Sequence, residues 1–237
     1  MRITTLVENR PSPDDPRLVA EWGLSQCVEV NGRRVLFDMG ASDAFARNAA
    51  HLGIDVAAID AAILSHHHYD HGGGLRRFLE LNDHAPVYLG EPPEGEPTAR
   101  LFGVIRKYIG LDRALLDEHA ARFHVLRQRT EVLPGIFVLP RIGGQHPRPS
   151  GNKLLFLRKG RQFTPDEFRH ELVVALPPFN RMSDGERLVA DMGRKVLDLG
   201  VGTTWTGHCT GTRALKVLRG AMGDRVQELH TGSRLEL

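Results

Sequence analysis

The residues best suited to chemistry lie together in one stretch. Positions 66 to 74 read His-His-His-Tyr-Asp-His-Gly-Gly-Gly. Side chains two apart in an extended chain point the same way, so His66, His68 and Asp70 are expected to converge. The glycines permit a turn that brings in His71. Neutral imidazoles with a carboxylate suit zinc, iron or manganese. The spacing therefore predicts a metal site, with His67 on the opposite face.

Two further polar residues follow predicted strands. His208 lies between a strand at Val201–Thr206 and a helix at Arg213–Met222, and Asp38 follows a strand at Arg34–Phe37. The histidine cluster itself follows Ile59–Ser65, an apolar run typical of a strand buried on both faces. Open α/β sheets commonly place ligands at the carboxyl ends of their strands, which is where this cluster lies.

The remaining pattern predicts alternating strands and helices in one domain spanning residues 1–237. Asn31-Gly32 indicates a hairpin between Ser25–Val30 and Arg34–Phe37. Ser42 is expected to cap a helix over residues 42–52. Further strands are predicted at residues 3–7, 86–89, 132–139, 153–158 and 172–176, further helices at 75–80, 111–123 and 183–197, and a loop at 91–97.

Composition excludes several classes of protein. The 237 residues are 41% hydrophobic and 25% charged with a formal net charge of +2, which excludes a disordered or collagen-like chain. The near-neutral charge argues against nucleic acid as a partner. No run is long and apolar enough for a signal peptide or a membrane span, so we expect a cytoplasmic protein. We accordingly expect Cys27 and Cys209 as reduced thiols rather than as a disulfide.

The motifs resemble those of a known fold. SHHHYDHGGGL resembles the H-x-H-x-D-H motif of the metallo-β-lactamase fold, and LFDMG and GHCTG resemble its early Asp and late His motifs. With VENR and LFLRKGRQFTPDEF, they are similar to the branch of dihydropterin–ribofuranosylaminobenzene phosphate synthase-like hydrolases. The resemblance spans nearly the whole chain and implies an α/β fold, an αββα sandwich.

The resemblance also implies roles for individual residues. His66 and His68 would bind a first metal ion, and Asp70, His71 and His208 a second. Asp38 would accept a hydrogen bond that orients a ligand histidine, or else it is a turn residue before Gly40. Zinc is the expected metal, as one or two ions, with Fe²⁺ or Mn²⁺ as alternatives. Asp70 could also orient the attacking water.

One segment of the branch pattern is missing. The branch has a Cys-Ser-His-Ala-Gly-like motif whose histidine completes the first metal site, but here LVVAL runs almost directly into PPFNRMSDGERL. Asn180 stands where the branch has the histidine of Gly-Gly-Phe-His. We therefore expect a sandwich truncated in its second half. His146, His170 or a partner subunit could supply the missing ligand, because catalytic zinc usually has three protein ligands.

Two functions are consistent with this sequence. The first is a metal-dependent hydrolase that directs metal-activated water at a small polar substrate, phosphorylated or pterin-like. No P-loop, GxGxxG or Ser-His-Asp pattern offers another catalytic apparatus. The alternative is a metal-poor, non-catalytic member that binds a ligand or a partner. A homodimer could cover the apolar surface that the missing segment would expose.

Overall fold

The computed structural model describes residues 1–237 apart from 102–104, 141–149, 176–196, 199, 209–210 and 237. Its largest sheet has seven strands in the order β16-β1-β2-β3-β4-β5-β8. From β16 to β3 neighbouring strands are antiparallel, and from β3 to β8 they are parallel. The strands are β1 (Arg2–Val7), β2 (Ser25–Val30), β3 (Arg33–Phe37), β4 (Ala61–Ile63), β5 (Val87–Gly90), β8 (Phe123–Leu126) and β16 (Arg234–Glu236).

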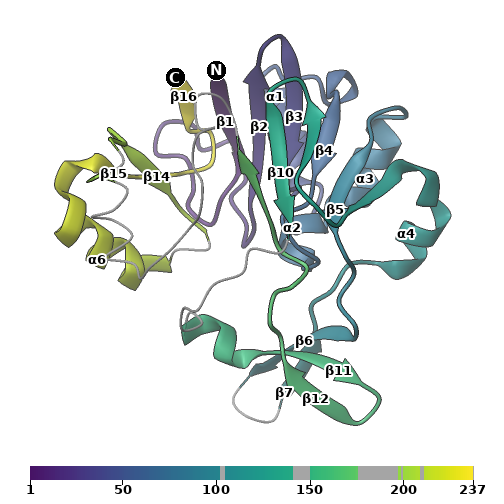
Figure 1. Ribbon diagram of the computed structural model, residues 1–237. Helices are drawn as coiled ribbons and strands as arrows, with labels where there is room; N and C mark the ends of the chain where they lie inside the picture. Colours follow the sequence, from purple (N-terminus) through teal and green to yellow (C-terminus); the bar gives the residue numbers. More distant parts are fainter. Residues whose placement is uncertain (102–104, 141–149, 176–196, 199, 209–210, 237) are drawn as a thin grey trace.

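Helices cover one face of this sheet (Figure 1). They are α1 (Ala44–His51), α3 (Leu75–Leu81) and α4 (Arg113–Glu118), with short 3-10 turns at Val56–Ala58 and Ala120–Arg122. Phe45 of α1 and Phe78 of α3 are fully buried in one apolar cluster with Leu36 and Leu64. All three residues of β4 are fully buried, as the apolar run predicted, because layers cover both faces of that strand.

A second, three-stranded sheet packs on the other face. Its order is β13-β10-β9, with β9 (Thr130–Leu133), β10 (Ile136–Pro140) and β13 (Leu172–Ala175). Val35 and Ile63 of the large sheet share a core cluster with Ile136, Val138 and Leu172. The single strand predicted at residues 132–139 is wrong. Pro134-Gly135 turns the chain between β9 and β10, and Gly135 has a positive φ of 81°.

A four-stranded sheet in the order β12-β11-β6-β7 lies below the sandwich in Figure 1. It comprises β6 (Glu96–Leu101), β7 (Ile105–Tyr108), β11 (Leu155–Lys159) and β12 (Gln162–Pro165), with a 3-10 turn at Ser150–Leu154. The predicted loop at 91–97 is therefore too long, since β6 begins at Glu96. No strand was predicted at β7, whose Arg-Lys pair gives it little apolar signal.

The last described helix forms a further layer. The helix α6 (Gly211–Met222) packs on the parallel pair β14 (Thr204–Thr206) and β15 (Val226–Glu228) through Leu215, Met222 and Val226, and a 3-10 turn spans Gly223–Arg225. The order of layers is that of an αββα sandwich. The predicted helix at 183–197 lies almost wholly outside the described residues. Among the described helices, none is both long and apolar enough to cross a bilayer.

Two details of the predicted elements need correction. Asp43, not Ser42, is the N-cap of α1, although the Ser42 hydroxyl accepts a bond from the Ala44 N–H at 3.1 Å. The helix predicted at 111–123 covers only Arg113–Glu118, since the 3-10 turn at Ala120–Arg122 follows it and β8 begins at Phe123. Cys27 is a free, buried thiol, as expected.

Candidate metal centre

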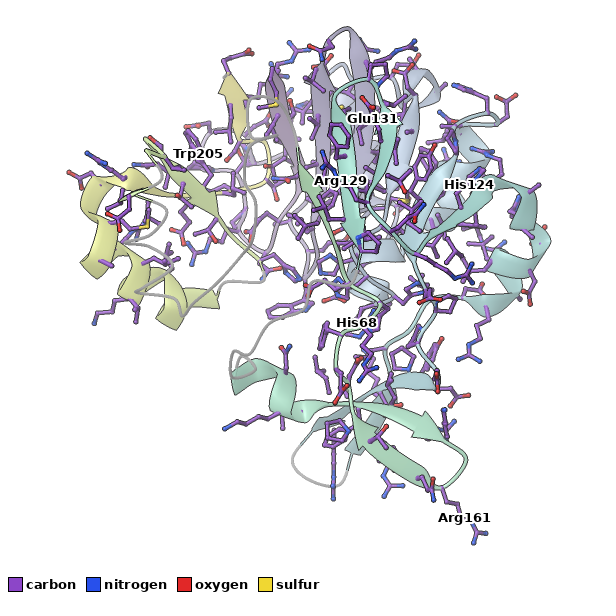
Figure 2. All side chains as sticks on the ribbon, in the orientation of Figure 1. His68, His124, Arg129, Glu131, Arg161 and Trp205 are labelled. Atoms are coloured by element: carbon purple, nitrogen blue, oxygen red, sulfur yellow. The ribbon has the colours of Figure 1, made fainter. Side chains whose placement is uncertain are left out.

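The predicted ligands lie at the carboxyl edge of the parallel strands, just after β4. His66, His68 and His71 are each less than a tenth exposed. Figure 2 shows His68 at the lower end of the sandwich, facing the four-stranded sheet. The extended arrangement expected for this segment is wrong in its second half. Asp70 and His71 belong to the short helix α2 (Tyr69–Gly72), so a helical turn brings them beside His66.

Close packing against the segment that follows β3 fixes the helix α2. The Met39 N–H donates to the His71 carbonyl at 2.6 Å, and the Gly73 N–H donates to the Gly40 carbonyl at 2.9 Å. A Cβ on Gly74 would stand 2.3 Å from the Met39 carbonyl oxygen. The glycines are therefore required because the backbone of the segment after β3 lies too close for a side chain. They do not serve to allow an unusual turn conformation, as the sequence had suggested.

Asp38 organises the buried side of the centre. Its carboxylate accepts three bonds, from His71 Nδ1 at 2.6 Å and from the Ser65 hydroxyl and N–H at 2.7 Å each. Asp38 is fully buried and has a φ of +56°. The contact with His71 is the hydrogen bond that the orienting role of Asp38 requires, and its positive φ is also consistent with the turn residue alternative, so the orienting role stays a prediction.

These bonds fix the tautomers of two histidines. Because Asp38 only accepts, His71 carries its proton on Nδ1 and its lone pair on Nε2. The Ser65 hydroxyl gives its one proton to Asp38, so it accepts from His66 Nδ1, 2.9 Å away. His66 therefore also carries its lone pair on Nε2. The ring centroids of His66 and His71 are 4.1 Å apart.

His208 approaches from the far end of the chain and is oriented in the same way. Its Nδ1 lies 2.8 Å from the Asn9 side-chain oxygen, which also accepts from the Gly23 N–H. A backbone N–H can only donate, which identifies that Asn9 atom as oxygen, so His208 is protonated on Nδ1. Its Nε2 faces Asp70, 3.4 Å from Oδ2. The Trp22 indole donates to the same carboxylate oxygen at 3.0 Å.

The charges of the centre suit a cation. Burial, reinforced by repulsion from His71, lowers the pKa of His66 well below its ordinary value, so this imidazole is neutral at pH 7. Burial acts to raise the pKa of Asp70, but the neighbouring His208 and His71 outweigh it and lower that pKa. The centre therefore combines a neutral imidazole at His66 with an ionised carboxylate at Asp70, as metal ligation requires.

The described residues fit a metal ion at this position. The ligand atoms of His66, Asp70 and His71 all lie within 4.8 Å of one another, and His208 Nε2 lies beside Asp70. The family resemblance implies that His66 shares a first ion with His68, whose ring centroid lies 4.6 Å from that of His66, and this pairing stays a prediction. In the structure His68 forms a second group with Asp166 and His170, also within 4.8 Å of one another. His146 lies outside the described residues.

Four residues that contact the ligands were not singled out from the sequence. Ser65 is the first residue of the SHHHYDHGGGL motif and Trp22 belongs to no quoted motif, and only their hydrogen bonds reveal their contacts with the ligands. Asn9 belongs to the VENR segment and Asp166 to the TPDEF segment, both noted for their resemblance to the branch. His67 Nε2 lies 2.9 Å from the Gly90 carbonyl oxygen, and its ring meets that of His170 edge-on with centroids 5.6 Å apart. That His67 binds no metal stays a prediction.

Comparison with known proteins identifies the family. The family model described as the metallo-beta-lactamase superfamily matches residues 22–212. The chain belongs to this superfamily. A 7,8-dihydropterin-6-methyl-4-(beta-D-ribofuranosyl)-aminobenzene-5'-phosphate synthase of Methanocaldococcus jannaschii is 26% identical, with 98% of this chain and 95% of the relative covered. That alignment runs over 284 positions, whereas this chain has 237 residues. The relative therefore contains residues that have no counterpart in this chain.

Solved structures share the metallo-β-lactamase fold. The structure of Tm1679, described as a metal-dependent hydrolase of the beta-lactamase superfamily, superposes with a TM-score of 0.74 at 25% identity, covering 100% of this chain and 99% of that one. The metallo-beta-lactamase fold protein YhfI from Bacillus subtilis gives a TM-score of 0.53 at 15% identity, with 99% of each chain covered. The αββα sandwich expected from the sequence is thus confirmed as a member of this fold.

Proposed function

We propose that this protein is a metal-dependent hydrolase that directs activated water at a small polar substrate carrying a phosphate or a pterin-like ring. The observation that carries the proposal is the preset orientation of three histidines. His66, His71 and His208 each have Nδ1 held by a hydrogen-bond partner, which leaves the Nε2 lone pair for a metal. A purely structural cluster would not need this common orientation.

The residues of the centre have different roles. A bound zinc, iron or manganese ion would lower the pKa of its water from about 15.7 toward 7 and polarise a carbonyl or phosphoryl oxygen. His66, His71 and His208 hold their rings in position through Ser65, Asp38 and Asn9. Asp70 remains ionised and accepts a hydrogen bond from the attacking water, which orients that water.

Two observations support the substrate class. The relative from Methanocaldococcus jannaschii is named as a synthase of a phosphorylated pterin compound. Lys107 of β7 brings its ammonium group to 4.8 Å from the ring of Tyr69, which precedes Asp70. A cation at this edge suits an anionic substrate group, because the attraction favours binding of a phosphate.

Metal content tests the proposal. Untagged protein purified without chelator should hold at least one ion per chain by elemental analysis, and the His71→Ala/His208→Ala double variant should lose it. Loaded protein should then hydrolyse phosphate esters from a panel of small substrates. A chain that holds no ion even after reconstitution with zinc, iron or manganese would refute the hydrolase and favour the non-catalytic alternative.

A further inference from the structure

We infer that Trp22 is a platform on which a planar, pterin-like heteroaromatic ring of the substrate stacks beside the metal centre. Because it concerns a substrate of the same centre, this role rests on the proposed function. Two observations carry it. The segment around Trp22 is fixed in place by its neighbours, and yet the indole ring itself is open to solvent.

Hydrogen bonds fix the backbone on both sides of Trp22. The Glu21 carboxylate accepts from the two N–H groups and the one hydroxyl of residues 41–42, at 2.9, 3.1 and 2.6 Å. Those two residues lead into α1, so Glu21 is tied to a helix of the sandwich. On the other side, the Gly23 N–H donates to the Asn9 side-chain oxygen at 3.1 Å. Trp22 therefore lies between two anchored residues.

The same segment is attached to the metal centre at two points. The Leu24 N–H donates to the Asp70 carbonyl oxygen at 3.2 Å, and the Trp22 indole donates to the Asp70 carboxylate at 3.0 Å. A Cβ on Gly23 would stand 2.5 Å from that carbonyl oxygen, so this close approach requires glycine. The edge of the indole that carries the N–H therefore faces the centre before any substrate binds.

The indole ring is exposed although its position is fixed. Trp22 is 62% exposed, the largest fraction for any large apolar side chain in the part of the chain that the structure describes. His208 meets the indole edge-on, with centroids 5.2 Å apart and ring planes at 73°, so it covers at most one face. A tryptophan that served only packing would bury its ring. The exposed area is therefore available to a ligand of the centre.

A planar heteroaromatic ring is the ligand that this surface suits. Aromatic rings stack with an offset at centroid distances of about 4.5–7 Å, and the electron-rich face of indole favours an electron-poor ring such as a pteridine. Because the indole is already ordered, stacking on it costs little conformational entropy. The ring would lie next to the ligands, since Trp22 and His208 face the same Asp70 oxygen, at 3.0 and 3.4 Å.

Fluorescence anisotropy of 6-hydroxymethylpterin, titrated with metal-free and with zinc-loaded protein, tests the platform. Trp22→Phe and Trp22→Leu both lose the N–H that Asp70 accepts, but only the Phe variant keeps a ring for stacking. We expect Trp22→Leu to bind the probe about 5- to 150-fold more weakly than wild type, the usual effect of losing an aromatic partner of a base. Trp22→Phe should lie closer to wild type. Cyclohexylmethanol, which has no planar ring, should compete no less well in Trp22→Leu.

Trp205→Phe is the matched control, because Trp205 of β14 is the other tryptophan of the chain. It should bind the probe as wild type does. If wild type does not bind the probe, or if Trp22→Leu binds it as tightly as Trp22→Phe, the inference is wrong, even where the protein hydrolyses phosphate esters. Probe binding that needs Trp22 in a protein that retains no metal would support the platform and refute the hydrolase.

Analytical ultracentrifugation tests whether a second copy of the chain covers the indole instead. Trp22→Leu should sediment with the same mass as wild type. If wild type is a dimer and Trp22→Leu is a monomer, the exposed ring belongs to an interface between copies and the inference is wrong.

Discussion

Asp38 offers the sharpest test of how the centre is held. In Asp38→Ala the His71 Nδ1–H and both donors of Ser65 lose their acceptor in a fully buried position. An unsatisfied buried donor costs about 1–3 kcal/mol, so three of them, with some relaxation, should cost about 4 kcal/mol of unfolding free energy. Because His71 loses its orientation, metal affinity should also fall about 10- to 100-fold.

Two further substitutions at position 38 separate the effect of the lost hydrogen bonds from the effect of the backbone conformation. Asp38→Asn keeps the shape and one accepting oxygen, so we expect about half the loss of stability. Asp38→Gly removes the same bonds as Asp38→Ala but accommodates the φ of +56°, which costs Ala about 1–2 kcal/mol. The Gly variant should therefore be at least as stable as the Ala variant, although glycine fills less of the buried space than alanine.

Urea unfolding and metal titration measure both effects. Asp60→Ala is the matched control, because Asp60 directly precedes β4, accepts from the Arg34 N–H at 2.8 Å and lies in contact with solvent. It should cost about 1 kcal/mol and leave metal binding unchanged. If Asp38→Ala loses less than about 1 kcal/mol and holds its metal as tightly as wild type, the orienting role of Asp38 is refuted.

Three other outcomes follow from single contacts. Gly74→Ala should lower the unfolding free energy by about 2 kcal/mol in urea unfolding, because its Cβ would stand 2.3 Å from the Met39 carbonyl oxygen. Trp22→Phe removes the donor to Asp70 from a side chain that is 62% exposed. Calorimetric titration should show about tenfold weaker metal binding with little loss of stability. Burial raises the pKa of Cys27 to about 11. Its alkylation in the native state should therefore be slow at pH 8 and about tenfold faster per pH unit below that pKa, as mass spectrometry of the modified peptide can follow.

The sequence predicted that His66, Asp70 and His71 lie close together after a buried strand, because the signals for both features are local. The apolar run before His66 marks a buried strand, and Asn31-Gly32 marks a hairpin whose two residues have positive φ angles of 51° and 72°. The apolar and polar pattern fails where an element is short or polar. The strand β7 reads Ile-Arg-Lys-Tyr, and the hairpin between β9 and β10 is hidden in one apolar stretch. Tertiary pairing, rather than local preference, decides these elements.

The division of the histidines into two groups depends on neighbours distant in sequence. His66 and His68 are two residues apart, and their spacing predicted only that both side chains converge with Asp70. In the structure Ser65 holds His66 on Nδ1, whereas His68 lies in a separate group with Asp166, nearly a hundred residues away. An imidazole offers its lone pair opposite the nitrogen that a partner holds. The chemistry of each histidine is therefore set by a contact that spacing does not encode, and only the fold reveals it.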